Sequence, residues 1–223
     1  MLNLFKKTNQ LYPELSPTER IPKIIKECIF PPLKKEGFKI LKSGLSIKRT
    51  QASFQQEIWF SKSKWNIEND ICAFTPHFTV TLKNYKKWHN SEFGEPPIND
   101  VLESHTAHYI HGWNGDLFDN DDYDLAKDDN ERIVELLNEN ILTQGIPFLE
   151  QLSNYKSATK YLMDSERYYL APKMIDICII NEDFQLANVV GNWFRNYERT
   201  GESEFKESTL KEMDQRGRKL TGA

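Results

Sequence analysis

The stretch Phe74-Thr-Pro-His-Phe-Thr-Val-Thr-Leu82 alternates apolar and polar side chains at every step. Because neighbouring side chains of a strand point to opposite faces of a sheet, this alternation predicts a β-strand with one buried face. Burying Phe78, Val80 and Leu82 stabilises the fold by about 1.5–3 kcal/mol each. A one-residue shift in pairing would expose all three, so the pattern also fixes which face is inward. Pro76 falls on the apolar face, which suggests an edge position or a bulge.

Two shorter stretches before it, Leu45–Lys48 and Gln56–Ser61, follow the same two-residue period. In the second, Ile58 and Phe60 share one face, with Trp59 on the other. Several strands so close in sequence favour an antiparallel sheet.

A helix precedes these strands. Ser16-Pro-Thr-Glu19 is typical of a helix start, and the apolar residues from Ile21 to Ile29 recur at three- and four-residue steps. Pro31 and Pro32 predict a kink or break, because proline lacks the amide hydrogen. Gly37 predicts the end of the helix, in the left-handed conformation.

The second half of the chain reads as helices. Asp116–Asp129 is interpreted as a solvated acidic linker, and an apolar stripe from Ile133 to Leu142 predicts a helix that stops at Gly145. Pro172–Ile180 and Phe184–Tyr197 predict an αα-hairpin.

These elements predict an α+β fold, in which an N-terminal helix and C-terminal helices pack on an antiparallel sheet. We expect an α+β domain over residues 1–165, a helical hairpin extension packed on it over 166–200, and a polar, partly disordered tail over 201–223.

Charge and cysteine usage narrow the class of protein. The 29 Lys and Arg against 33 Asp and Glu give a net charge of −4, which argues against a nucleic-acid partner. The three scattered cysteines suit a reducing compartment. We see no signal sequence and no membrane-spanning run, and expect a cytoplasmic protein.

The chain resembles a bacterial family of unknown function, domain of unknown function 4304. The resemblance lies in four segments: Leu33–Lys39, Ile47–Arg49, Ile58–Asn66 and Phe78–Leu82. It continues weakly through His111–Leu117 and Tyr123–Leu125 to the helix with Gly145–Leu149, and so covers roughly Ile21 to Tyr161. It implies the fold and carries no catalytic residue over.

Three of the five histidines fall between residues 105 and 111. On a helix, His105 and His108 would share a face, as metal ligands do, with Asp116 as a nearby carboxylate. On a strand they would point to opposite faces. A metal-dependent hydrolase is therefore one alternative function, although polar surface histidines are the simpler explanation.

Two further groups are candidates for a partner-binding surface. Trp59 and Trp65 interleave with lysines, a pattern found in protein interfaces and in proteins that bind single-stranded nucleic acid. Single-stranded nucleic-acid binding is therefore the second alternative function. The carboxylates of Asp119, Asp121, Asp122 and Asp124 are suited to a basic partner; they lack the glycine and glutamate that a calcium loop needs.

No nucleotide-binding or nucleophile motif is present in the sequence. We therefore expect no cofactor and no catalytic residue. The favoured hypothesis is a non-enzymatic protein-binding module, of immunity or adaptor type, whose partner is another protein.

Overall fold

The computed structural model describes residues 9–67, 70–117, 122–196, 207–208 and 210–214, and the chain divides into two compact units, 1–150 and 151–223. The first unit contains α1 (Pro17–Ile24), the π-helix η1 (Ile25–Ile29), α2 (Phe30–Lys35), β1 (Lys39–Ile40), β2 (Ser46–Gln51), β3 (Phe54–Lys62), β4 (Ala73–Leu82), α3 (Tyr85–Phe93), β5 (Val101–Thr106), the 3-10 helix η2 (Ala107–Tyr109), β6 (Tyr123–Asp124), α4 (Asn130–Asn140) and the π-helix η3 (Ile141–Gly145). The second contains α6 (Tyr155–Asp164), the 3-10 helix η4 (Tyr168–Leu170), α7 (Ala171–Ile180) and α8 (Phe184–Arg195), while α5 (Ile146–Leu152) spans the boundary.

The α+β class is confirmed. The sheet is antiparallel, with the strand order β1-β2-β3-β4-β5, and β6 pairs with β4. The strand expected at Phe74–Leu82 is β4, and it pairs with β3 over that whole stretch. Phe74, Phe78 and Val80 are fully buried, as the alternation predicted.

Pro76 lies in the central strand β4 and away from the bulge at Val80 and Thr81, so the expected edge position is realised only locally, at a break in the pairing of β4. The Phe60 amide donates to the carbonyl of Leu45, the residue before β2. The paired Phe60 and Pro76 are therefore not hydrogen-bonded to each other, and the nitrogen of Pro76 points away from β3. On that side β5 pairs with residues 77–81 and β6 with residues 73–74, so Pro76 faces the gap between them. A central strand tolerates proline there because no ladder hydrogen bond is required.

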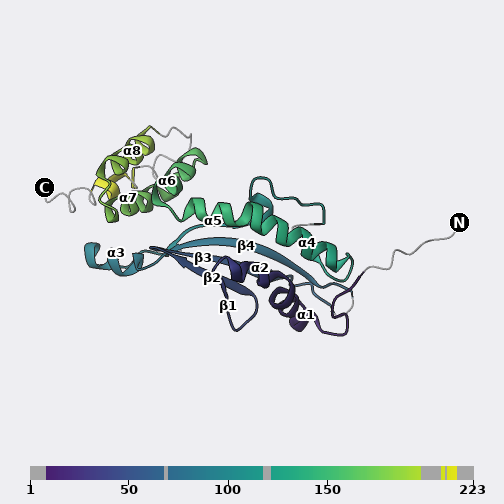
Figure 1. Cartoon of the computed structure of the whole chain (residues 1–223). Coiled ribbons are helices and arrows are strands. Elements are labelled where there is room, and N and C mark those ends of the chain that lie inside the picture. Colours follow the sequence, from purple (N-terminus) through teal and green to yellow (C-terminus); the bar gives the residue numbers. More distant parts are fainter. Residues whose placement is uncertain (1–8, 68–69, 118–121, 197–206, 209, 215–223) are drawn as a thin grey trace. The chain divides into compact units, whose positions relative to one another are not determined.

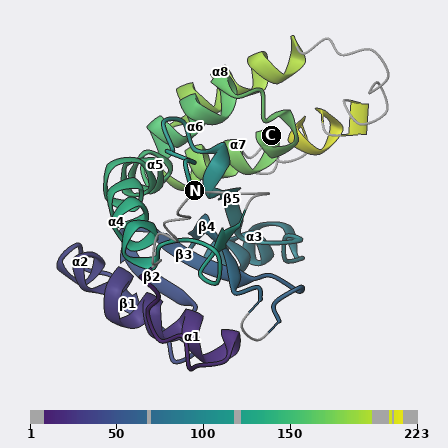
Figure 2. The ribbon, with the colours of Figure 1, turned by 90° about the vertical axis from the view of Figure 1, so that its right-hand side faces the viewer.

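One continuous helical segment, α4–η3–α5, runs along the sheet (Figures 1 and 2). The predicted stop at Gly145 was therefore wrong. A Cβ atom at Gly145 would lie 2.3 Å from Cε1 of Phe78, so the glycine permits a close approach of helix and sheet. Leu149 adds to this contact, since its carbonyl accepts a hydrogen bond from Nε2 of the buried Gln56 (3.2 Å).

The N-terminal helix begins at Pro17 as expected, but Pro31 and Pro32 do not break it. The segment continues from α1 through η1 into α2, and π-turns are a known response to a disturbed hydrogen-bond ladder. The carbonyl of Cys28, which Pro32 cannot bond, accepts a hydrogen bond from Asn138 Nδ2 in α4 (3.1 Å). The helix ends at Lys35, and Gly37 follows the cap residue Glu36 with φ +82°, the left-handed conformation predicted for it.

Arg20 ties this helix to the start of α4. Its guanidinium is 3% exposed and donates to the carbonyls of Leu11 (2.8 Å) and Leu125 (3.1 Å) and to Asn130 Oδ1 (2.8 Å). Since each acceptor is a neutral oxygen, the guanidinium acts here as a directional donor to three chain segments.

In the second unit, α7 and α8 form the predicted αα-hairpin. The sequence suggested a division near residue 165, whereas the first unit ends at Glu150 and α6 lies in the second. Most of the tail 201–223 falls outside the described residues; Met213, in a short helical piece, is buried. Within the described part of the chain, every helix is too short or too polar to cross a bilayer.

Candidate functional site

The face of the sheet opposite Phe78 is polar. The strand register places on it side chains of four strands, which we call the polar face: Ser46, Lys48, Glu57, Trp59, Ser61, Thr75, His77, Thr79, Ser104 and Thr106. Neighbours on this face are joined in pairs, because cross-strand side chains lie within contact distance. Lys48 Nζ lies 3.0 Å from Glu57 Oε2, and Thr79 Oγ1 lies 2.8 Å from Ser104 Oγ.

Trp59 and His77 form the centre of the polar face. Their rings stack with centroids 3.9 Å apart and planes within 12°. The indole Nε1 of Trp59 donates to Thr79 Oγ1 (3.3 Å). Trp59 is therefore half-buried and held in place. The sequence indicated this pair only in that both residues alternate with apolar residues along their strands and so point to the solvent side of the sheet.

The imidazole of His77 lies between two hydroxyl groups. Ser61 Oγ is 2.8 Å from its Nε2, and Thr106 Oγ1 is 3.4 Å from its Nδ1. Burial lowers the pKa of His77, the Asp122 carboxylate opposes this shift, and His108 adds to it. A hydrolytic triad has a carboxylate at the second ring nitrogen, whereas here a hydroxyl group lies beside that nitrogen, so the third group of such a triad is replaced.

The histidine segment is a strand followed by a 3-10 turn, so the helical spacing considered for His105 and His108 is not realised. His105 lies in β5 on the helix-covered face, with its ring 5.3 Å from that of Phe148 and its Nε2 3.7 Å from Glu103 Oε1. The ring of His108 lies 3.8 Å from that of Tyr109. Asp116 is exposed, and its amide donates to Asn114. Within the described ranges, no group of three or more His, Cys, Asp or Glu residues is placed to hold a metal ion.

The segment Asp116–Asp129 is not simply a solvated linker, which corrects that interpretation. Asp122 accepts a hydrogen bond from the Thr75 hydroxyl. The buried Asp124, in β6, accepts from the amides of Cys72 and Ala126 (both 3.0 Å). Both carboxylates therefore accept hydrogen bonds within the fold, close to where β6 joins β4. Asp119 and Asp121 lie outside the described residues.

The loop between β3 and β4 displays apolar side chains. Trp65 is 67% exposed and Ile67 is 56% exposed. The side chain of Asn66 donates to the Ala73 carbonyl (2.9 Å) and accepts from the Ala73 amide (2.7 Å), which fixes the loop against the strand. Lys64 Nζ lies 4.9 Å from the centroid of the Trp65 ring, a cation–π contact. We call residues 63–67 the hairpin tip; the sequence identified Trp65 but not the two bonds of Asn66.

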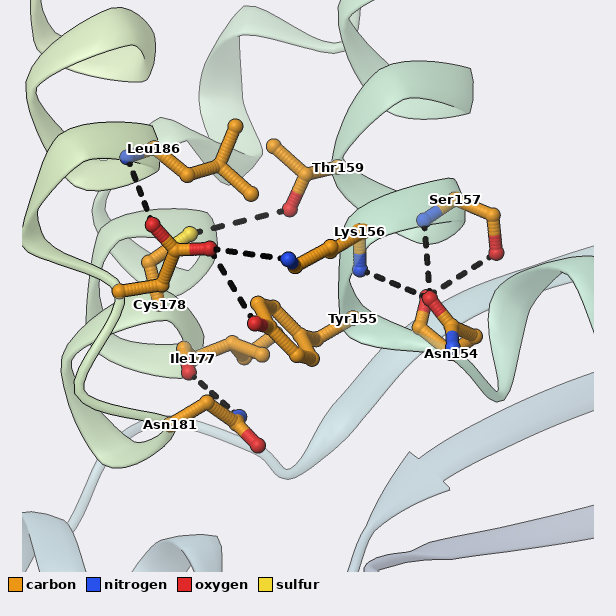
Figure 3. Close-up of polar contacts among 10 residues, drawn as sticks. Asn154, Tyr155, Lys156, Ser157, Thr159, Ile177, Cys178, Asn181 and Leu186 are labelled. Carbon is orange, nitrogen blue, oxygen red and sulfur yellow. Dashed lines mark hydrogen bonds and ion pairs between the residues drawn. The ribbon is translucent and has the colours of Figure 1, made fainter.

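The second unit holds a polar cluster around Asp183, at the start of α8. Figure 3 shows three of its members, Tyr155, Lys156 and Leu186. Asp183 accepts from the Leu186 amide (3.0 Å) and the Tyr155 hydroxyl (3.1 Å), and Lys156 Nζ lies 3.7 Å away. The Leu186 amide, followed by Tyr155 and Lys156, lowers the pKa of Asp183. This geometry is that of a helix cap that also joins α6 to α8, so it is structural.

A comparison with family models gives one match, to a family described as Domain of unknown function (DUF4304). The match covers residues 29–151, more than half of the 223-residue chain. It runs from the end of η1 to α5 and leaves out the helices of the second unit. Searches of curated proteins and of solved structures found no match to this chain.

Proposed function

The chain belongs to the DUF4304 family, and we propose that it is a non-enzymatic protein-binding module of immunity or adaptor type. We place it in the reducing cytoplasm of a bacterial cell, in keeping with three free cysteines. The proposal concerns the first unit, which holds most of the family match.

The hairpin tip is the observation that carries this proposal. Tryptophan is enriched among the residues that dominate interface energies. Trp65 and Ile67, two positions apart in one loop, are both exposed. An apolar tip of this kind fits an apolar pocket on a partner protein.

The rigidity of the tip adds to the argument. Association costs free energy when a loop must be ordered on binding, and a loop already fixed in its bound shape avoids that cost. Asn66 fixes the tip through its two bonds to Ala73, and the Ser63 amide adds a third bond to the same residue (3.0 Å). Trp65 is thus presented on a loop whose shape is set by the sheet.

Affinity purification tests the proposal. The full chain would be used as bait at low and high salt, beside Trp65→Ala and a control, Ile98→Ala, which truncates a fully exposed residue of another loop. We expect a protein partner to be retained by the wild type and by Ile98→Ala and lost from Trp65→Ala. Retention of no partner at either salt concentration, or equal retention by both variants, would contradict the proposal.

A further inference from the structure

Positive charge collects at one edge of the first unit, although the chain carries a net charge of −4. Lys34 and Lys35 lie in the last turn of α2, Lys39 lies in β1, and Lys42 lies in the turn after it. All four are exposed, and between residues 34 and 43 the only acidic residue is Glu36. We call these four lysines the basic edge.

The fold leaves this charge uncompensated. β1 ends the sheet, and its Lys39 lies directly opposite Lys48 of β2, a like-charge pair that costs stability. Glu57 neutralises Lys48 at 3.0 Å. Across the residues with a described position, by contrast, none of the four lysines of the basic edge is in an ion pair.

Two structural explanations account for parts of the basic edge. Lysine on an edge strand discourages sheet-to-sheet aggregation, which suits Lys39. Lysine in the last turn of a helix interacts favourably with the helix dipole, which suits Lys34 and Lys35. Neither explains Lys42, in the turn after β1, or its neighbour in the sequence Leu41, an apolar side chain that is 42% exposed.

We propose that the basic edge binds an acidic segment of a partner protein. This inference rests on the proposed function and names the chemistry of the partner, whose carboxylates would pair with the lysines while an apolar side chain covers Leu41. A protein fits better than a nucleic acid. The aromatic residue within residues 34–43, Phe38, is 2% exposed and lies under Arg49, where its ring cannot stack on a base.

The test uses the full-length chain, isotope-labelled for NMR, and a synthetic twelve-residue peptide of alternating glutamate and valine. A peptide of lysine and valine, a short DNA duplex and vesicles containing phosphatidylglycerol serve as competing probes. Lys39→Glu with Lys42→Glu removes half of the basic edge. Lys83→Glu with Lys87→Glu, at exposed positions elsewhere, makes the same change in net charge.

We expect the acidic peptide to shift the amide signals of residues 34–42 and to bind more weakly as salt rises. The variant pair at the basic edge should weaken binding about tenfold, since two favourable charge pairs become repulsive. The control pair and Trp65→Ala should change it by less than twofold.

Signals that shift elsewhere, an equal effect of both charge-reversal pairs, or tighter binding of DNA or vesicles would overturn the inference. A failed peptide titration is distinguishable from a failure of the proposed function, because the proposed function is tested separately, by whether Trp65→Ala loses the partner that the wild type captures.

Discussion

Replacing Gly145 by alanine tests how the long C-terminal helical segment packs on the sheet. The added Cβ atom would lie 2.3 Å from Cε1 and 2.7 Å from Cζ of Phe78. Carbon atoms in contact are separated by about 3.5–4.0 Å, so the ring or the helix has to move by more than about 1 Å. Phe78 is fully buried, and the ring of Trp113 packs against it edge-on at 5.5 Å, which leaves little room for that movement.

The magnitude follows from two opposing effects. Overpacking a tight core costs about 1–3 kcal/mol, and the enclosed ring places this site near the upper value. Alanine gains about 1 kcal/mol over glycine in a helix. We therefore expect Gly145→Ala to lower the free energy of unfolding of the first unit by about 2 kcal/mol.

The assay is urea unfolding followed by circular dichroism, with two further variants. In the Phe78→Leu background, Gly145→Ala should cost less, because the smaller side chain relieves the clash. Gly191→Ala in α8 is the matched control: its Cβ atom would meet Arg195 at 3.5 Å and Met213 at 3.9 Å, so the second unit should gain up to about 1 kcal/mol. A Gly145→Ala protein as stable as the wild type would refute the close packing of helix and sheet.

Substitutions at three further positions test other contacts. Arg20→Lys keeps the charge but cannot reach all three acceptors. The Leu125 carbonyl keeps a hydrogen bond from Asn130 Nδ2 and Asn130 Oδ1 keeps one from the Leu11 amide, so the substitution mainly removes the donor to the Leu11 carbonyl and should cost about 1–3 kcal/mol in total in urea unfolding. A loss below about 0.5 kcal/mol, on the order of a surface change, would contradict the role given to Arg20. Because the pKa of His77 is lowered in the folded protein, the unfolded chain binds a proton more readily, and stability should fall as the pH drops below about 6.5. His77→Gln should flatten that part of the profile of stability against pH. Identical profiles for the variant and the wild type would show that His77 is not buried as described. The lowered pKa of Asp183 places its contribution above pH 3.8, to be lost in stronger acid. Asp183→Asn should keep the helix cap and remove this acid dependence, whereas Asp183→Ala should lower the melting temperature of the second unit at pH 7.

The sequence predicted those elements whose residues all follow one period. The alternation of Phe74–Leu82 survives in β4 because each apolar residue of that stretch faces the helices. The end of the first helix near Gly37 was also predictable, since a positive φ at that residue suits glycine best.

Elements that depend on distant partners were not predictable. Gly145 has the local features of a helix stop, but its role is set by Phe78, which lies 67 residues earlier in the sequence. Asp122 and Asp124 have the composition of a solvated linker, yet Thr75 and the Cys72 amide bind them within the sheet. Composition describes a residue's usual surroundings, whereas these residues are positioned by tertiary contacts.

The candidate site was predicted only in part, for the same reason. Trp65 was recognisable as an aromatic residue among lysines, and it is exposed. Trp59 follows the same pattern but stacks on His77, because the pairing of β3 with β4 places the two residues opposite each other. Which of two similar tryptophans is displayed thus depends on strand register, which the sequence did not specify.

The most direct test of the central claim is the dissociation constant of the captured partner, measured by calorimetry with the wild type, Trp65→Ala, Asn66→Ala and the control Ile98→Ala. Loss of a dominant interface side chain costs about 2 kcal/mol or more, so we expect Trp65→Ala to weaken binding by about 30-fold. Asn66→Ala, which frees the loop but keeps the indole, should have a smaller effect, and Ile98→Ala none. A partner that binds Trp65→Ala within twofold of the wild type would show that the hairpin tip is not the binding surface.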